Sequence, residues 1–286
     1  MKCGLSMYSL LAPVRKGQLD LYGFLDYAAR RGFDGVELLD MFWTDEAAEV
    51  AGAKRRCEAL GLELPVYSIS TNFLQPDESE REAELTSLKH GVDLATQLGA
   101  PLLRVFSGDL LPGYTFEQGF SRVVDSLATG AEYAAGRQIT LVLENHGKVA
   151  GRSEQVRAII EAVDSAALRC NLDTGNFLLV GENPVEASAA LADFVALVHL
   201  KDLDLASQEQ TDHVHAGLDG QRYTGVIVGE GLVDFSAIVE ILVQQGYGGW
   251  LSLEYEGGAD AMGVAVPRSL AAMRALLQRA HGPASE

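Results

Sequence analysis

The chain has 286 residues, of which 48% are hydrophobic and 22% are charged, so it has the material for a large core and lacks the polar excess of disordered proteins. Its 40 acidic residues outnumber its 22 basic ones, and the formal net charge is −18. Such a charge repels the phosphates of nucleic acids and of anionic membranes. We therefore expect no nucleic-acid partner and no membrane partner, while association into a homo-oligomer is left open.

Cysteine usage favours a reduced, cytoplasmic setting. Cys3, Cys57 and Cys170 are odd in number and widely spaced, which indicates neither a disulfide framework nor a thiolate zinc site. The first residues show no signal-type segment, and no apolar run reaches the roughly 18 residues of a membrane span. We expect no targeting segment.

Short apolar runs alternate with longer amphipathic stretches along the chain, which is typical of parallel strands buried under helices. Strands are predicted at residues 3–9, 35–39, 63–69, 102–107, 139–144, 169–173, 195–200 and 250–255. Helices are predicted near residues 19–31, 45–60, 79–98, 117–136, 153–163, 184–192, 234–246 and 266–280. Eight strands, each followed by a helix, predict an α/β fold of the (β/α)8 TIM-barrel type, in a single domain over residues 1–286.

Glycines punctuate this repeat at similar places. Each of five follows a predicted helix and precedes a strand, where a helix commonly ends on a residue with left-handed backbone. They are Gly32, Gly61, Gly99, Gly136 and Gly246. This shared punctuation supports one repeating unit.

A long loop insertion interrupts the repeat after the seventh strand. Residues 203–230 are polar and contain glycines, in a place where a few residues would suffice. Loops after barrel strands lie on the catalytic face, so we expect the insertion to cover or line the active-site mouth. The alternative is a disordered surface segment.

Ionisable side chains end four of the apolar strands. Burial of such groups is costly unless they are paired or bound to metal. They are Glu144 after Leu143, Asp173 after Leu172, His199 after Val198 and Glu254 after Leu253. Strands five to eight are neighbours in a barrel, so these side chains converge at its top face. For any one of them alone, a salt bridge or a helix cap is an alternative.

Three converging carboxylates repel one another, and a divalent cation relieves that repulsion. Three carboxylate oxygens and one imidazole nitrogen favour Mn²⁺, with Mg²⁺, Co²⁺ and Zn²⁺ as alternatives. We predict one divalent metal ion, and its predicted ligands are Glu144, Asp173, His199 and Glu254.

Five motifs in order resemble the sugar phosphate isomerase/epimerase family with xylose-isomerase-like barrels. The motifs are Gly35-Val36-Glu37-Leu38, Leu143-Glu144-Asn145-His146-Gly147, Leu172-Asp173-Thr174-Gly175-Asn176, Val198-His199-Leu200-Lys201-Asp202 and Leu253-Glu254-Tyr255-Glu256-Gly257. The resemblance runs from the second strand to the eighth. It implies the same four metal ligands, with Glu144 and Glu254 also acting as acid and base on opposite faces of a substrate carbon.

Two departures from the ketose epimerases of that family concern substrate contacts. Gly175-Asn176 stands where many of them carry a histidine, and Lys201-Asp202 directly follows His199, where they carry an arginine a few residues on. The Lys201-Asp202 form looks more like the branches that include inosose dehydratases and enzymes acting on oxidised sugars.

Further candidates lie after the same strands or in the insertion. His146 and Lys201 are predicted to be catalytic, in shuttling a proton or neutralising an oxyanion. The predicted substrate contacts are Glu37, Trp43, Asn176, His213 and His215. The alternatives are a capping or packing role for His146, a pair with Asp202 for Lys201, an ion pair for Glu37, core packing for Trp43, and a solvated loop for the two insertion histidines.

The leading hypothesis is a metal-dependent isomerase or epimerase that removes a proton next to the carbonyl of a ketose or related small sugar. The alternative is a lyase or dehydratase acting on a keto-sugar, a keto-inositol or a 3-oxo-glycoside, including C-glycoside cleavage. An endonuclease on the same barrel is disfavoured by the charge of −18. It is also disfavoured because six histidines are too few for the three-zinc cluster of such an enzyme. A catalytically silent barrel would not need both Glu144 and Glu254. No basic cradle follows strands seven and eight, which favours an unphosphorylated substrate.

Overall fold

The computed structural model describes residues 1–110 and 115–280. Eight parallel strands close into a barrel in the order β1-β11-β7-β6-β5-β4-β3-β2. They are β1 (Lys2–Ser6), β2 (Gly35–Leu39), β3 (Glu63–Ser68), β4 (Leu102–Val105), β5 (Thr140–Glu144), β6 (Leu168–Asp173), β7 (Val195–Leu200) and β11 (Trp250–Leu253). The predicted TIM-barrel fold is confirmed.

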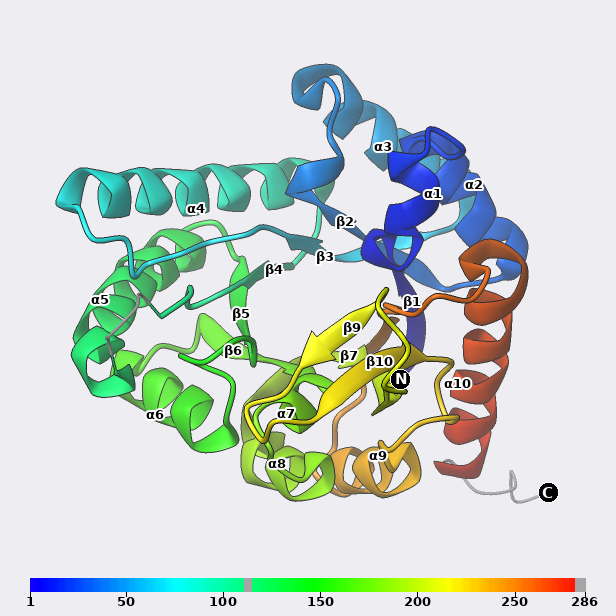
Figure 1. Ribbon diagram of the computed structural model, residues 1–286. Coiled ribbons are helices and arrows are strands. Elements are labelled where there is room, and N and C mark those ends of the chain that lie inside the picture. Colours follow the sequence, from blue (N-terminus) through cyan, green and yellow to red (C-terminus); the bar gives the residue numbers. More distant parts are fainter. Residues whose placement is uncertain (111–114, 281–286) are drawn as a thin grey trace.

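Helices surround the barrel and cover the outer face of its sheet (Figure 1). The main helices are α2 (Leu21–Arg31), α3 (Glu46–Leu60), α4 (Glu78–Leu98), α5 (Phe116–Ala135), α6 (Ser153–Val163), α8 (Pro184–Leu191), α9 (Phe235–Gln244) and α10 (Val266–Ala280). Short helices are η1 (Met7–Leu10), α1 (Leu11–Arg15), η2 (Asp40–Phe42), α7 (Asn176–Leu179), η3 (Ala192–Phe194) and η4 (Ala261–Ala265).

Polar side chains cap the N-termini of several of these helices. Asp20 accepts a hydrogen bond from the Gly23 amide at 2.7 Å, and Asn183 caps α8 directly before Pro184. Among the five punctuating glycines, all but one have the predicted positive φ, and Gly136 has a φ of −62°. After α5 the left-handed position falls instead on Gln138, with a φ of 61°.

Strand side chains alternate between the barrel interior and the helix layer. Val66, Val142 and Leu197 form an apolar layer inside the barrel. Toward the carboxyl ends the inward positions become polar and stay fully or almost fully buried: Glu37, Ser68, Arg104, Asn171, His199 and Ser252. The barrel therefore carries a polar floor beneath its catalytic face.

Two segments differ from the predicted elements. The first strand ends at Ser6 rather than at residue 9, because the Ser6 hydroxyl accepts a hydrogen bond from the Tyr8 amide and starts η1. The long loop expected at 203–230 holds an antiparallel sheet in the order β8-β10-β9, built from β8 (Asp202–Leu205), β9 (Val214–Ala216) and β10 (Arg222–Val226). An isolated bridge between Gly225 and Gly257 ties this sheet to the loop after β11.

Within the described ranges, no helix combines the length and the apolar character that crossing a membrane requires.

Candidate metal centre and active site

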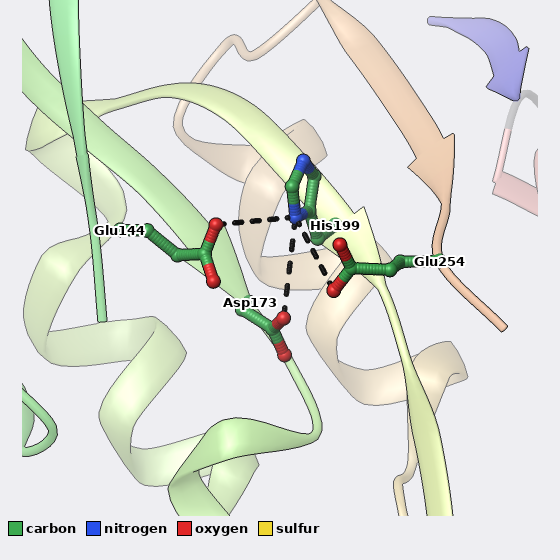
Figure 2. Close-up of side chains that lie close together, drawn as sticks. All are labelled: Glu144, Asp173, His199 and Glu254. Atoms are coloured by element: carbon green, nitrogen blue, oxygen red, sulfur yellow. Dashed lines mark ion pairs between the residues drawn. The ribbon is translucent and has the colours of Figure 1, made fainter. Parts of the chain in front are cut away.

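The four predicted metal ligands lie together at the carboxyl ends of four adjacent strands. Glu144 ends β5, Asp173 ends β6, His199 lies in β7, and Glu254 directly follows β11. Each is buried, and each offers a ligand atom within 4.8 Å of the other three. Figure 2 shows the three carboxylates pointing toward one nitrogen of His199. The convergence expected from strand order is thus observed.

That nitrogen is Nδ1, and one oxygen of each carboxylate lies within 4.0 Å of it. It lies 3.4 Å from Glu144 Oε2, 3.7 Å from Glu254 Oε2 and 4.0 Å from Asp173 Oδ2. Nδ1 has no hydrogen-bond partner among the residues that the structure describes. Buried polar atoms are seldom left so. One nitrogen and three carboxylate oxygens fit a divalent cation, which would satisfy Nδ1.

The other ring nitrogen of His199 faces Glu37. Nε2 lies 3.0 Å from Glu37 Oε2, and that carboxylate also accepts hydrogen bonds from the hydroxyls of Ser68 at 2.5 Å and Ser252 at 2.7 Å. A carboxylate behind a ligand histidine fixes the ring and its tautomer. Glu37, predicted to contact substrate, is placed beneath the cluster, where it orients His199.

Lys201 enters the cluster from the end of β7. Its Nζ lies 2.7 Å from Glu254 Oε2, 2.9 Å from Asp173 Oδ2 and 2.7 Å from Glu256 Oε1. It does not pair with Asp202, whose carboxylate instead accepts hydrogen bonds from backbone amides where the insertion returns to the barrel. The ammonium group therefore belongs to the cluster itself.

Burial and mutual charge shift the pKa values of these groups strongly. Burial raises the pKa of Asp173 to about 8, with Lys201 opposing and Glu254 adding to the shift. For His199, burial lowers the pKa, but Glu37 and Glu254 outweigh it and raise the pKa well above its usual value. For Glu254, burial is outweighed by Lys201 and His199, which hold its pKa well below the usual range. Without metal, protons and the ammonium group hold the carboxylates together.

Amide and guanidinium groups complete the surroundings of Glu144. Asn176 Nδ2 donates to Glu144 Oε1 at 3.3 Å, and Asn176 Oδ1 accepts from Lys201 Nζ at 3.2 Å. Asn171 Nδ2 donates to Glu144 Oε2 at 3.1 Å, and Arg104 Nε lies 3.3 Å from the same oxygen. Sequence reasoning assigned no role to Arg104 and missed Asn171, although each is a polar residue inside an apolar strand, the same signal that marked the ligands.

His146 and Trp43 lie away from the cluster. The His146 side chain is exposed and packs against the Phe106 ring, with centroids 4.4 Å apart. Trp43 Nε1 donates to the hydroxyl of Tyr67 at 2.8 Å. Because Ser68 points into the barrel, its neighbour Tyr67 faces the helix layer, and Trp43 packs there.

The insertion brings His213 and His215 to the same face of the barrel. Both line a cavity of about 590 Å³ together with Tyr8 and Glu256. His215 Nε2 lies 3.3 Å from Glu256 Oε2, and burial lowers the pKa of His215. Glu256 therefore lies between His215 and Lys201, and it connects the insertion to the cluster.

This fold has known counterparts. Residues 25–276 match the family of xylose isomerase-like TIM barrels. The chain belongs to this family. Among solved structures, the IOLI protein with a binding zinc atom superposes with a TM-score of 0.82 at 17% identity, covering 99% of this chain and 100% of that one. An L-ribulose 3-epimerase superposes with a TM-score of 0.78 at 18% identity, covering 98% and 95%.

Curated relatives are named as lyases. An inosose dehydratase of Geobacillus kaustophilus is 34% identical over 140 residues, which span 47% of this chain and 44% of that protein. An inosose dehydratase of Clostridium botulinum is 28% identical over 241 residues, 80% of this chain and 79% of that protein. A 3-oxo-isoapionate decarboxylase of Pectobacterium atrosepticum is 26% identical over 243 residues, 83% and 79% respectively.

Proposed function

We propose that this protein is a divalent-metal-dependent lyase that removes a proton next to a carbonyl of a sugar-like ketone and eliminates a group from the adjacent carbon. The observation that carries the proposal is the buried cluster of one imidazole nitrogen and three carboxylates, with His199 Nδ1 left for a ligand. The names of the relatives support dehydration or decarboxylation over isomerisation. The isomerase or epimerase expected first shares the initial proton abstraction.

The donor set supports a metal held by Glu144, Asp173, His199 and Glu254. When bound, the cation supplies a Lewis acid for the carbonyl oxygen of the substrate. We propose Mn²⁺ as the native ion, because thiolates are missing and three of the four donors are carboxylates; a structure with zinc in the family keeps Zn²⁺ as the competitor.

The proposed roles of the side chains follow from their contacts. Glu144 and Glu254 lie on neighbouring sides of His199 and provide carboxylates for proton abstraction. Lys201 carries a proton beside Glu254 and can deliver it to a departing hydroxyl group. Asn176 holds both Glu144 and Lys201, which fixes the distance between the base and the proton donor. We also propose that His146, which is exposed in the loop after β5, contacts a substrate hydroxyl.

The setting we propose is the reducing cytoplasm. Cys3, Cys57 and Cys170 are all free and buried in the structure. Burial raises the pKa of the Cys3 thiol to about 11, so this group stays protonated and unreactive.

The test is turnover by the purified protein of ketoses, keto-inositols and 3-oxo-glycosides in D₂O with Mn²⁺ added, together with its metal content. Release of water, carbon dioxide or an aglycone identifies a lyase, whereas deuterium uptake without elimination identifies an isomerase or epimerase. Glu254→Gln should lower kcat by roughly 10²-fold or more. Activity of any of these kinds that is unaffected by metal removal would overturn the proposal.

A further inference from the structure

A cavity beside the metal cluster is separate from the ligands themselves. It lies between the segment after β1 (Tyr8 to Gln18), the segment after β11 (Tyr255 to Ala261) and the start of β9 at His213 and His215. Its volume of about 590 Å³ is in the range of sites for small organic ligands. The cavity therefore has room for part of a substrate beyond its reacting carbons.

One wall of the cavity leads directly to the cluster. Glu256 lines the cavity, and its Oε1 lies 2.7 Å from Lys201 Nζ, which in turn lies 2.7 Å from the ligand Glu254. A substrate whose carbonyl end reaches the cluster can thus extend its other end past Lys201 into the cavity.

The charge of this cavity differs from that of the molecule. Arg15 and Lys16 line it, and neither forms an ion pair with any described residue. Its two carboxylates are engaged: Glu256 contacts Lys201 and His215, and Asp260 accepts a hydrogen bond from the Gly263 amide at the start of η4. In a chain of net charge −18, two unpaired cations around one cavity, together with two histidine rings that can donate hydrogen bonds, form a local site for an anion.

We propose that this cavity binds a carboxylate at the far end of the substrate, through Arg15, Lys16 and the insertion histidines His213 and His215. The reaction at the near end rests on the function proposed above. A phosphate is the less suitable anion, because barrels usually bind it at a helix N-terminus after the last strands. Here the Asp260 carboxylate already accepts the hydrogen bond of the Gly263 amide at the N-terminus of η4, so that amide is not free for a phosphate.

Calorimetric titration of the Mn²⁺-loaded protein with matched acids and neutral polyols tests this subsite. The pairs are D-gluconate against D-glucitol and quinate against myo-inositol, with glucose 6-phosphate as the phosphate probe. We expect at least one acid to bind ten times or more as tightly as its neutral partner. Arg15→Gln/Lys16→Gln should remove most of that difference and leave the binding of the neutral polyol unchanged.

A charge-matched control separates local contact from general attraction. Arg55→Gln/Arg157→Gln changes the net charge equally on α3 and α6, away from the cavity, and should keep the preference for the acid. Equal binding of acids and polyols, no binding of either, or an equal loss in the control would overturn the subsite. Tighter binding of glucose 6-phosphate would overturn the carboxylate assignment. Failure of the proposed function shows separately, as absence of Mn²⁺ binding or of elimination.

Discussion

The two ring nitrogens of His199 face different partners. Nε2 faces the carboxylate of Glu37, and Nδ1 faces the proposed metal site. Glu37 lies 3.0 Å from Nε2, and the three other carboxylates lie around Nδ1. Histidine ligands depend on such a partner to hold the tautomer that leaves the other nitrogen free. The geometry thus leaves Nδ1 facing the proposed metal site, and we propose Glu37 as a positioning residue.

Glu37→Gln tests that role. The substitution keeps the shape of the side chain but removes the charge facing Nε2, so we expect Mn²⁺ affinity to fall roughly 10- to 100-fold while the protein stays folded. Titration calorimetry and circular dichroism measure the two effects. Glu63→Gln, an exposed glutamate on β3, is the control. An unchanged Mn²⁺ affinity in Glu37→Gln would remove the assigned role.

Lys201→Gln separates catalysis from metal binding. The ammonium group neutralises Asp173 and Glu254 but is not a metal ligand, so its removal should leave Mn²⁺ bound at least as tightly. We expect kcat to fall by roughly 10²-fold or more, because the proton donor is lost. Steady-state kinetics with metal analysis checks both. Loss of bound Mn²⁺ together with activity would show that Lys201 only maintains the cluster.

At the residue scale, the sequence predicted which residues lie at strand ends better than it predicted where the side chains of loop residues point. Glu144, Asp173, His199 and Glu254 were recognisable because each charged group interrupts an apolar strand end, and strand order brings them together. Which way a side chain leaves a loop depends on tertiary packing. Trp43 therefore contacts Tyr67 in the helix layer, and no local sequence pattern indicates this contact.

At the scale of elements, a buried carboxylate anchors the end of the insertion. Asp202 accepts hydrogen bonds from the amides of Gly229 at 2.8 Å, Gly231 at 2.9 Å and Val233 at 3.3 Å. These bonds fix the point at which the chain leaves β10 and turns toward α9. The position of His215 over Glu256 depends on the same sheet.

Asp202→Ala should therefore destabilise the protein, since three amides lose their acceptor. We expect the free energy of unfolding to fall by about 2 kcal/mol or more. Urea denaturation followed by circular dichroism measures the change. Asp204→Ala, two residues along β8, removes only a bond to the amide of Leu205 and serves as the matched control. Equal effects of the two substitutions would contradict the anchoring role of Asp202.

The regular elements were predictable from periodicity, and the irregular ones were not. The helix at 153–163 and the strands at 35–39 and 195–200 have the predicted bounds, because their apolar spacing is set by burial. The strands β8 to β10 are short, polar and rich in nearby glycine, so their sequence has the composition of a loop. Their pairing depends on one another and on the loop after β11.

At the scale of the whole molecule, metal binding is linked to pH. Burial raises the pKa of Asp173 from 3.8 to about 8, and the pKa of His199 is also raised. A raised folded-state pKa contributes stability at low pH that is lost as pH rises through it. The metal-free protein should thus lose stability as the pH rises toward the Asp173 pKa of about 8.

The cation competes with those protons, so its apparent affinity should rise over the same range, with protons released on binding. We expect the increase in Tm on exchanging EDTA for Mn²⁺ to be larger at about pH 8 than at about pH 6. Thermal scans at several pH values, with calorimetry in buffers of different ionisation enthalpy, measure both quantities. A Tm increment independent of pH would contradict the proton competition.

The closure of the barrel between β1 and β11 has a consequence for synthesis. Cys3 in β1 pairs with Leu251 in β11, so one edge of β1 stays unpaired until β11 has been synthesised. Glu254 follows that last strand directly. Three ligands are therefore made well before the fourth, and a nascent chain cannot hold the ion with its full set until the barrel can close. Binding of the proposed ion through all four ligands would then report that the barrel is complete.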